Sequence, residues 1–311
     1  MTVRVYRWDD ASAPTLTGQL GSLTTLLNAC LVTGYGAKAA AGWSSPYSGT
    51  NKRVFRNGAG STQMYLRVCH DATTDGYNAR VVGYETMTNV DTGTNPFPTT
   101  AQVSGGDYIT VSNTTDSTTR PWVVVADAKR FYLWCGQDQT SANGFTSTTA
   151  KMLYFFGDVI SRKAVDPYKF LIAANAASGY TGNYFAYNVG GLSTMVPGNY
   201  FARSYNGTGG SIAAGKQAEY GYYAYNFGTG GPAYPDPLTK GMNMAQIRVH
   251  EQGVERGKLP GGWSPIHALP GNNGDTFTGV GALSGKTFML LDCSMSSTRA
   301  RVAIEISDTW E

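Results

Sequence analysis

One segment near the start of the chain has apolar residues at helical spacing. Their positions follow the i, i+3, i+4, i+7, i+8 pattern of an amphipathic helix. Ser22 can cap the N-terminus of this helix, and Gly34 can end it in a left-handed conformation. These signals predict about eleven residues of helix. The apolar stripe consists of Leu23, Leu26, Leu27, Cys30 and Leu31.

The rest of the chain has mostly the patterns of β-strands. Residues 64–69 alternate between apolar and other side chains, which is typical of a half-buried strand. Two apolar runs, 122–126 and 131–135, are separated by four residues, so we predict a β-hairpin with both strands buried. A third buried strand is predicted over 151–156. Further strands are predicted over 79–84, 170–174, 184–189, 200–203, 246–250, 288–292 and 301–306.

These patterns predict a mainly β fold: an antiparallel sandwich or barrel-like body with one short N-terminal amphipathic helix and long loops. The long loops are expected over 86–107 and 204–243, and loops of such length are usually functional or folded against a partner. Residues 36–46 are small and nearly uncharged, which indicates a linker or extended arm. We therefore expect an N-terminal strand, helix and arm in residues 1–50 and a β-rich body in 51–311, with a candidate division near 160–168.

The composition favours a surface that other subunits cover. Only 14% of the 311 residues are charged, against about a quarter in ordinary soluble domains. Low charge suits a surface buried in an assembly, although a monomeric β protein with an uncharged polar surface is the alternative. The net charge of +3 is spread along the chain, so the electrostatic footprint of a nucleic-acid-binding protein is missing.

The cysteines and the apolar runs bear on redox state and membranes. The four cysteines are widely spaced without a CxxC pair, so zinc sites of the usual spacing are excluded and buried free thiols are expected. Charges among the first ten residues interrupt any signal-peptide pattern. No stretch approaches the ~18 apolar residues of a membrane span, so we expect a protein kept in the cytoplasm or released by lysis. The cysteines are Cys30, Cys69, Cys135 and Cys293.

Two glycine-containing segments resemble nucleotide-binding loops without the required context. Residues 34–39 fit G-x-G-x-x-A, but these glycines follow a predicted helix, whereas a nucleotide loop opens one. Gly285-Lys286-Thr287 matches the end of a P-loop, but Val280 stands where that loop needs glycine. A turn entering the strand over 288–292 explains this second segment better. No cofactor is expected.

The titratable residues form no motif with an evident catalytic role. The three histidines, at positions 70, 250 and 267, lack metal-binding spacing, so no metal site is expected. Cys69 and His70 are adjacent, and neighbouring strand residues point to opposite faces, so they are poorly placed as a nucleophile and base. A glycosidase needs two carboxylates across one cleft, and Asp9 and Asp10 would diverge in an extended segment.

A tyrosine-rich segment is the best sequence candidate for recognition. Tyrosine gives a large contact area at low entropic cost and keeps a polar tip. A subunit interface filled by these side chains is the first interpretation, a plain strand with tyrosines on both faces is the second, and stacking on sugar rings is the third. The candidate residues are Tyr220, Tyr222, Tyr223, Tyr225 and Phe227.

Several segments resemble a family of structural proteins of tailed-bacteriophage virions. They are residues 6–10, 21–36, 79–85, 121–133, 256–263, 274–279 and 305–310. The resemblance spans nearly the whole chain and carries no catalytic residue. It implies a particle component present in many symmetric copies, as a head-decorating or head-fibre protein or as part of the neck or baseplate.

From this resemblance we expect a non-enzymatic virion protein that forms a homo-oligomer, a trimer or larger ring, and docks on other virion proteins after assembly in the bacterial cytoplasm. Symmetry would multiply weak contacts. The helix and arm are the candidate assembly anchor, so deleting residues 1–42 should abolish incorporation and leave a folded body. The alternatives are a receptor- or glycan-binding tail module that contacts host surface glycan and, third, a polysaccharide depolymerase. The anchor residues are Leu23, Leu26, Leu27 and Leu31.

Overall fold

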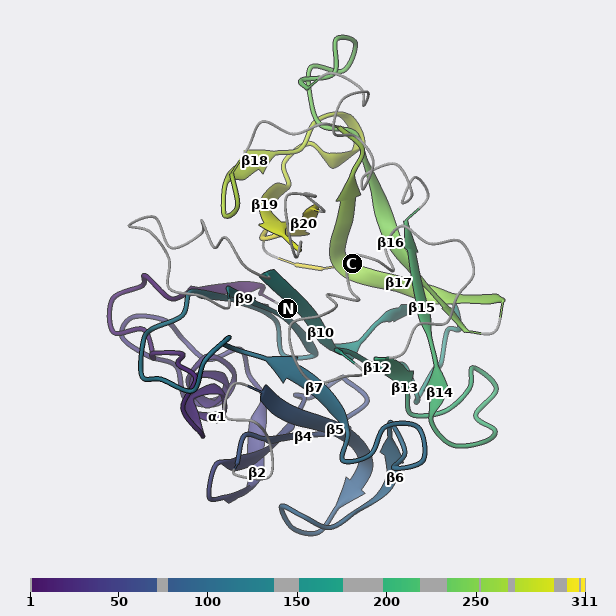
Figure 1. Cartoon of the computed structure of the whole chain (residues 1–311). Helices are drawn as coiled ribbons and strands as arrows, with labels where there is room; N and C mark the ends of the chain where they lie inside the picture. The colour runs from purple at the N-terminus through teal and green to yellow at the C-terminus, as the bar shows by residue number, and fades with distance from the viewer. Residues whose placement is uncertain are drawn as a thin grey trace.

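The chain folds into three antiparallel β-sheets and one short helical segment, so the predicted mainly β fold is confirmed. The sheets follow one another from the bottom to the top of Figure 1, and we call them the N-terminal, central and C-terminal sheets. No helix in the described part is long and apolar enough to cross a membrane. The computed structural model describes residues 2–71, 78–136, 151–175, 198–218, 234–251, 253–267, 272–293, 301–307 and 309–310.

The central sheet joins strands from both halves of the chain. Its middle is the predicted hairpin, in which Ala126 pairs with Phe131 and the second strand pairs with the predicted third strand. Strands on both sides of residues 160–168 belong to this sheet, so that segment does not separate two sheets. In spatial order the strands are β1 (Arg4–Arg7), β8 (Trp122–Ala126), β9 (Arg130–Gly136), β10 (Lys151–Asp158), β12 (Phe170–Ala173), β13 (Asn199–Phe201) and β14 (Ile212–Ala213).

The two outer sheets are each nearly continuous in sequence. The N-terminal sheet contains β2 (Ser44–Gly49), β3 (Lys52–Arg56), β4 (Tyr65–Cys69), β5 (Asn78–Met87), β6 (Gly93–Phe97) and β7 (Asp107–Thr110). The C-terminal sheet contains β15 (Gly215–Ala218), β16 (Met244–Glu251), β17 (Val254–Pro265), β20 (Arg301–Glu305), β19 (Thr287–Asp292) and β18 (Thr276–Thr278), and β11 (Ile160–Ser161) pairs with β17. A 3-10 turn, η2 (Gly281–Leu283), precedes β19.

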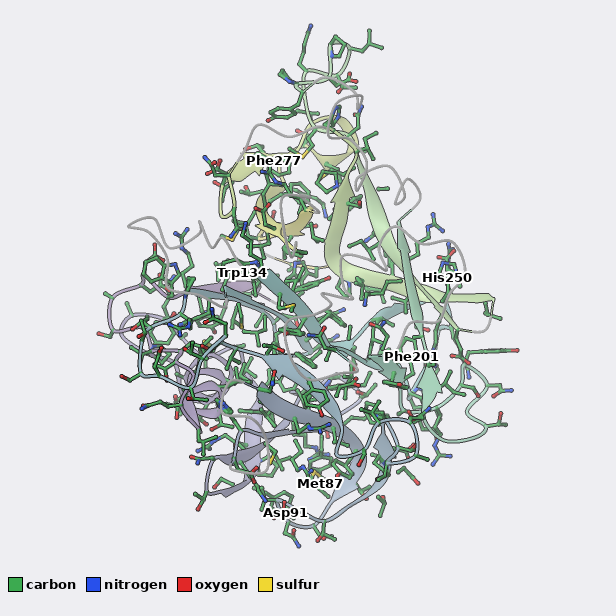
Figure 2. All side chains as sticks on the ribbon, in the orientation of Figure 1. Met87, Asp91, Trp134, Phe201, His250 and Phe277 are labelled. Carbon is green, nitrogen blue, oxygen red and sulfur yellow. The ribbon has the colours of Figure 1, made fainter. Side chains whose placement is uncertain are left out.

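The central sheet is buried on both faces, which explains the unbroken apolar runs of its strands. Successive side chains of a strand point to opposite faces. Phe131 and Leu133 of β9 accordingly enter a first core shared with the N-terminal sheet, whereas Tyr132 and Trp134 enter a second core shared with the C-terminal sheet. Figure 2 labels Trp134 between the central and C-terminal sheets. Each outer sheet thus packs against a different face of the same central sheet.

The predicted helix is present and forms part of the first core. It comprises α1 (Ser22–Asn28) and a π-helical turn, η1 (Ala29–Thr33), and it ends at Gly34 with φ of 78°. Its N-terminus differs from the prediction. Gly21 occupies the cap position in a left-handed conformation, and His70 Nδ1 accepts a hydrogen bond from the Leu23 amide at 3.4 Å. Ser22 Oγ instead donates to the Thr17 carbonyl at 2.8 Å.

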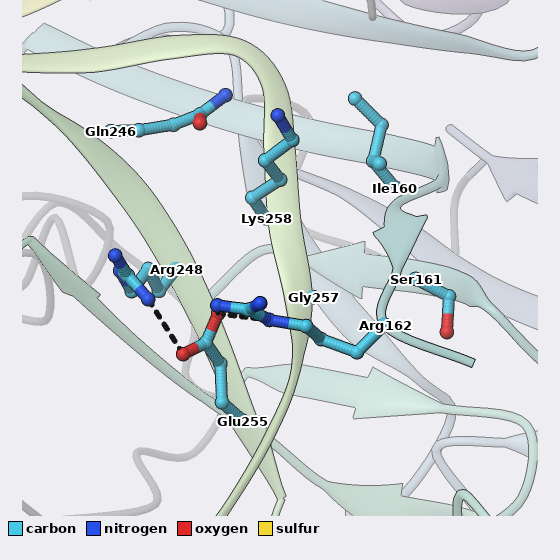
Figure 3. A pocket seen from close by; sticks show the side chains of 8 residues that line it. All are labelled: Ile160, Ser161, Arg162, Gln246, Arg248, Glu255, Gly257 and Lys258. Atoms are coloured by element: carbon cyan, nitrogen blue, oxygen red, sulfur yellow. Dashed lines mark hydrogen bonds and ion pairs between the residues drawn. The ribbon is translucent and has the colours of Figure 1, made fainter. Parts of the chain in front are cut away.

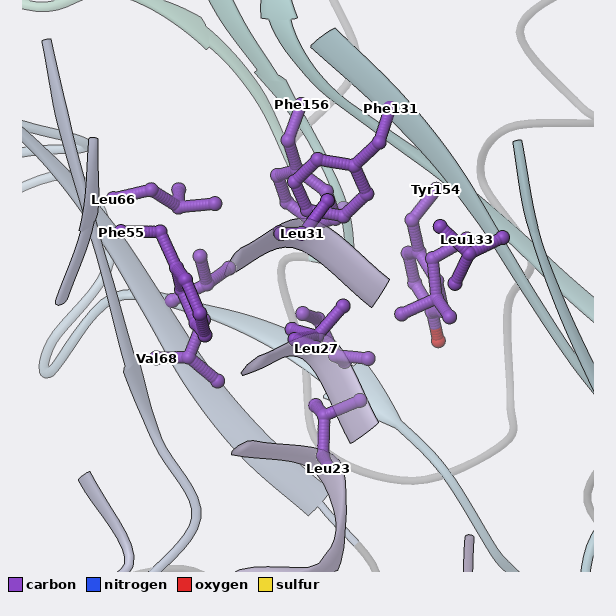
Figure 4. Packing of buried hydrophobic residues seen from close by; sticks show 14 of the residues in the cluster. Leu23, Leu27, Leu31, Phe55, Leu66, Val68, Phe131, Leu133, Tyr154 and Phe156 are labelled. Atoms are coloured by element: carbon purple, nitrogen blue, oxygen red, sulfur yellow. The ribbon is translucent and has the colours of Figure 1, made fainter. Parts of the chain in front are cut away.

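The predicted anchor residues are core residues. Leu23, Leu26, Leu27 and Leu31 are all fully buried. Figure 4 shows the labelled leucines between Phe55 and Leu66 of the N-terminal sheet on one side and aromatic residues of the central sheet on the other. An amphipathic stripe indicates a buried face without saying what covers it. Because the chain itself covers this face, the leucines are not available to dock on another protein, and this assignment is corrected.

The predicted arm also packs against the body. The Ala41 amide donates to the Cys30 carbonyl at 3.0 Å. Trp43 is buried, and its Nε1 donates to the Asp127 carbonyl at 2.9 Å. Since β1 also pairs with β8, residues 1–50 are integrated into two sheets. Deleting residues 1–42 would therefore remove core elements, and we no longer expect a folded body to remain.

Several strands lie where the apolar pattern gave no signal. Both segments predicted as long loops contain short strands: β6 in the first, and β14 and β15 in the second. The longest strand, β17, was not predicted because glycine and proline interrupt its alternation. The predicted strand over 184–189 lies outside the described residues. The four cysteines are buried and free, as expected.

Candidate binding surface

The most irregular strand, β17, has a bend that shapes the outer face of the C-terminal sheet. Gln246 of β16 pairs with Trp263, whereas Arg248 pairs with Lys258. The single residue Ile247 therefore stands opposite the four residues 259–262. An excess of residues on one strand bends that strand and increases its twist. Figure 1 shows β17 turning sharply near its middle.

Glycines and the underlying aromatic residues fix this bend. Gly261 has φ of 66°, a left-handed conformation that favours glycine. A Cβ atom there would overlap the Trp310 ring, and one at Gly262 would overlap the Tyr132 hydroxyl. Tyr132 Oη donates a hydrogen bond to the Pro260 carbonyl at 2.9 Å. The bend is thus held directly on the central sheet.

Arg256 ties the beginning of β17 to the rest of the molecule. Its buried guanidinium group makes a bidentate ion pair with Asp166, with hydrogen bonds of 3.0 and 3.1 Å, and a second ion pair with Glu251 at 2.6 Å. Its remaining N–H groups donate to the carbonyls of Arg203 and Tyr168. All five donors of the side chain are occupied, so Arg256 has a structural role and none is left for a ligand.

Asp166 is charged in this environment. Burial raises the pKa of its carboxyl group, but the hydrogen bonds and the charge of Arg256 outweigh burial and hold the pKa below its usual value. Ser161 Oγ adds a hydrogen bond to the same carboxylate at 2.8 Å. The group therefore stays ionised with its guanidinium partner at neutral pH.

A polar hollow, which we call the basic pocket, opens above β11, β16 and β17 (Figure 3). Glu255 lies between two arginines, with Arg162 Nη2 at 2.8 Å and Arg248 Nη1 at 2.7 Å from its carboxylate. Burial raises the pKa of Glu255, but the two hydrogen bonds outweigh burial and lower the pKa overall. The pocket has a volume of about 240 Å³ and is lined by Ile160, Ser161, Arg162, Gln246, Arg248, Glu255, Gly257 and Lys258.

Lys258 is the unneutralised cation of the basic pocket. It stands in a cross-strand row between Arg248 and Ile160. In the part of the chain that the structure describes, neither its ammonium group nor the side-chain amide of Gln246 has a hydrogen-bond partner. Figure 3 shows both side chains at the same side of the hollow. Among the residues that the structure describes, the pocket thus combines an unpaired positive charge with an unpaired amide.

A second hollow on the same sheet, the apolar groove, lies at the other end of β16 and β17. Its floor rests on a small cluster that includes Phe288 and Leu290. The indole Nε1 of Trp263 is buried there without a hydrogen-bond acceptor among the described residues. The groove has a volume of about 510 Å³ and is lined by Thr239, Met242, Asn243, Met244, Trp263, Ile266, Val280, Gly281, Ala282 and Leu283.

The two hollows belong to one continuous face. Along β16 the residues Met244, Gln246 and Arg248 are half-buried, and the residues between them are buried in the second core. Since alternate side chains share a face, Met244 in the apolar groove and Arg248 in the basic pocket point the same way. Gln246, which pairs with Trp263, lies between them.

The structure does not bring the sequence-predicted titratable residues into one site. His70 lies beside the helix, whereas His267 Nε2 accepts from the Asn243 amide at 2.8 Å. Burial raises the pKa of Cys69 to about 11, so its thiol is protonated at neutral pH. Asp9 pairs with Arg7, and Asp10 accepts from the Tyr35 hydroxyl. Among the described residues, no group of His, Cys, Asp or Glu is arranged to hold a metal ion.

The remaining sequence candidates have structural explanations or lie outside the description. Gly34 ends the helix, as predicted, and does not open one. Gly285 belongs to a turn before β19, also as predicted, and Lys286 makes an ion pair with Glu305 at 3.0 Å. The tyrosine-rich candidates lie outside the described residues, and they are Tyr220, Tyr222, Tyr223, Tyr225 and Phe227.

Both hollows were missed as sites by sequence reasoning. Their lining residues are dispersed along the chain, and the register of β16 against β17 brings them together. The available signal was the segment 256–263, in which charged and aromatic residues alternate with glycine and proline. In comparisons with known proteins, no protein-family model and no curated protein sequence matches the chain.

Proposed function

We propose that this protein is a non-enzymatic structural component of a tailed-phage virion, where it forms a homo-oligomer and docks on other virion proteins. The sequence resemblance suggests the particle, and head decoration, head fibre, neck and baseplate are the candidate positions. The observation that carries the assembly role is the apolar groove. It is an open, largely apolar hollow on the outer face of the C-terminal sheet.

The residues of the groove have the composition of a subunit interface. Interface cores are enriched in tryptophan and methionine and depleted of charged residues. The groove presents Trp263, Met242 and Met244 and has no charged residue in its lining. Leu238, close to it in sequence, is 89% exposed. Apolar side chains gathered in an open hollow favour a protein contact.

The position of the groove also suits a contact between copies. The groove shares residues with the cluster of Phe288 and Leu290, which alternate along β19 with Met289 and Leu291 of the second core. It therefore lies on the face of the C-terminal sheet that points away from the central sheet. Figure 2 shows Phe277, which stacks on Phe288, at this end of the molecule. An outward-facing patch that meets the same patch of another copy gives a two-fold dimer, and one that meets a different surface of the next copy gives a ring when the rotation closes.

The assembly role is tested at the edge of the groove. We expect Leu283→Asp to convert the purified oligomer into a monomer and to abolish incorporation into particles, because the carboxylate would be buried without a partner. The matched control is Val165→Asp, which adds the same charge at a site that is 75% exposed and outside the groove. Light scattering gives the oligomeric state, and mass spectrometry of purified particles gives incorporation. A wild-type protein that is monomeric and absent from particles would contradict the proposal.

The two alternative functions differ in their support. The basic pocket favours a glycan-binding module and is considered below. A depolymerase needs two carboxylates facing one cleft. The lining of the basic pocket contains one, Glu255, and that of the apolar groove contains none. Neither hollow therefore offers the pair of carboxylates that hydrolysis needs.

A further inference from the structure

We propose that the basic pocket binds an acidic sugar residue, whose carboxylate pairs with Lys258 and whose hydroxyl groups bond to Gln246, Glu255 and the two arginines. This site is separate from the apolar groove and does not depend on the assembly role.

The charge of the lining selects an anionic group. Three cationic side chains face the hollow and one carboxylate opposes them. Glu255 is engaged by Arg162 and Arg248. Three cations and one carboxylate leave an excess of positive charge, and Lys258 is the cation with no partner in the described part of the chain. A carboxylate placed beside Lys258 would make a charge-assisted hydrogen bond, which is about twice as strong as a neutral one.

The mixture of donors and acceptors selects a polyhydroxylated ligand over a simple anion. Glu255 and the amide oxygen of Gln246 are acceptors, and both would repel a sulfate or phosphate that filled the pocket. Sugar hydroxyl groups donate as well as accept, so they can satisfy both kinds of lining atom. One carboxylate on such a ring then satisfies Lys258. An acidic sugar uses every free polar group of the pocket.

The strand pairing beneath the pocket favours a sugar over an acidic peptide. The floor of the pocket is β17, which is paired here with β16 on one side and with β11 on the other. Its main-chain groups are therefore engaged, and an extended peptide could not add to this strand by β-augmentation. Recognition must come from side chains. The volume of about 240 Å³ is just below the range of drug-sized sites, which suits a single sugar ring.

The pocket is also held in shape before any ligand arrives. Arg162 and Arg248 are fixed by Glu255. Gly257 lies so close to the Ile160 carbonyl that a Cβ atom would overlap it, and the saturated network of Arg256 lies next along the strand. Fixed side chains lose little entropy on binding, which favours affinity.

The test uses the full chain and two disaccharides that differ in one group, one ending in glucuronate and the other in glucose. By isothermal titration calorimetry, we expect the glucuronate disaccharide to bind at least about tenfold more tightly, since one charge-assisted hydrogen bond is lost with glucose. Lys258→Met should remove this preference, and Lys258→Arg should retain it. The matched control, Lys240→Met, removes an exposed lysine outside the pocket and should leave binding unchanged.

Four results would overturn the proposal: equal binding of the two disaccharides, unchanged binding by Lys258→Met, tighter binding of a polyglutamate peptide than of glucuronate, or competition by sodium sulfate at an equal concentration, which would indicate a general anion site. If Lys258→Met fails to fold, as judged by its melting temperature, Gln246→Leu provides the second variant. It should weaken binding of both disaccharides and preserve the preference for glucuronate.

Discussion

Lys216 is a buried lysine whose ionisation should control stability near neutral pH. Its Nζ donates to Asn199 Oδ1. Burial lowers the pKa of the ammonium group to about 7, and the opposing effect of Asp107, whose own pKa burial raises well above the usual value, does not offset this. The ordinary lysine pKa is near 10.4, so between these values the unfolded chain binds the extra proton. Stability should therefore rise with pH from about 7 to about 10, by up to about 1.4 kcal/mol per unit.

The variant Lys216→Met tests this dependence. This variant lacks the titrating group. The difference between its free energy of unfolding and that of the wild type should therefore be largest at pH 6, with the variant more stable. The difference should shrink as the pH rises to 9. Urea denaturation at pH 6, 7, 8 and 9 measures it. A difference that is constant with pH would show that Lys216 keeps an ordinary pKa in the folded state.

At the residue scale, the sequence indicates residue types and leaves their partners open. Arg256 and Asp166 are 90 residues apart, and neither has a sequence signal that predicts their ion pair. The pairing depends on how β17 lies against the loop before β12. Lys258 and Gln246 line one pocket for the same kind of reason, because an irregular register sets which side chains are neighbours. Regular periodicity cannot predict a bulge.

At the element scale, α1 gives the clearest prediction of stability. Leu27 is fully buried between two sheets. Removing a buried leucine side chain leaves a cavity and costs about 2–5 kcal/mol. We expect Leu27→Ala to reduce the free energy of unfolding by this amount. Leu20→Ala, at a site that is 39% exposed just before the helix, should cost less than about 1 kcal/mol. Equal losses in urea denaturation would mean that the helix is peripheral.

The same elements show where sequence patterns succeed. The helix and the strands β8, β9 and β10 have strong, regular patterns, and they were predicted close to their observed bounds. The predicted role of the helix was wrong. Its apolar stripe was expected to dock on a partner protein, but it packs in the space between the N-terminal and central sheets. That space exists because three sheets stack, which local patterns do not reveal.

At the scale of the whole molecule, the central sheet couples the other two. Its strands contribute alternate residues to both cores, so neither outer sheet can lose its packing without exposing one face of the central sheet. The suspected boundary at 160–168 illustrates the point. This segment contains Asp166, which binds Arg256 of the C-terminal sheet. Polar residues there hold two sheets together, although in the sequence they break the apolar pattern and suggest a domain boundary.

Arg256→Met should therefore destabilise the whole chain. The variant leaves Asp166 and Glu251 buried without their cation, which typically costs about 3–5 kcal/mol. Arg162→Met, at an exposed arginine nearby, should change stability by less than about 1 kcal/mol. Circular dichroism and tryptophan fluorescence should report one melting transition for each protein, shifted only in Arg256→Met. Two separate transitions would show that the outer sheets unfold independently.

The pH dependence of this loss follows from the same ion pair. In the wild type, the pKa of Asp166 is held below its usual value. The ionised carboxylate therefore stabilises the folded chain at any pH above the pKa that Asp166 has in the unfolded chain. This contribution is lost as the pH falls through the pKa that Asp166 has in the folded chain. In Arg256→Met, burial without the guanidinium group would instead raise the pKa, and protonation would relieve the unpaired charge. The stability difference between wild type and variant should thus narrow from pH 7 to pH 4. If the difference in stability between the two proteins does not change with pH, the Arg256→Met variant is destabilised by lost packing and not by the loss of a cation that compensates Asp166.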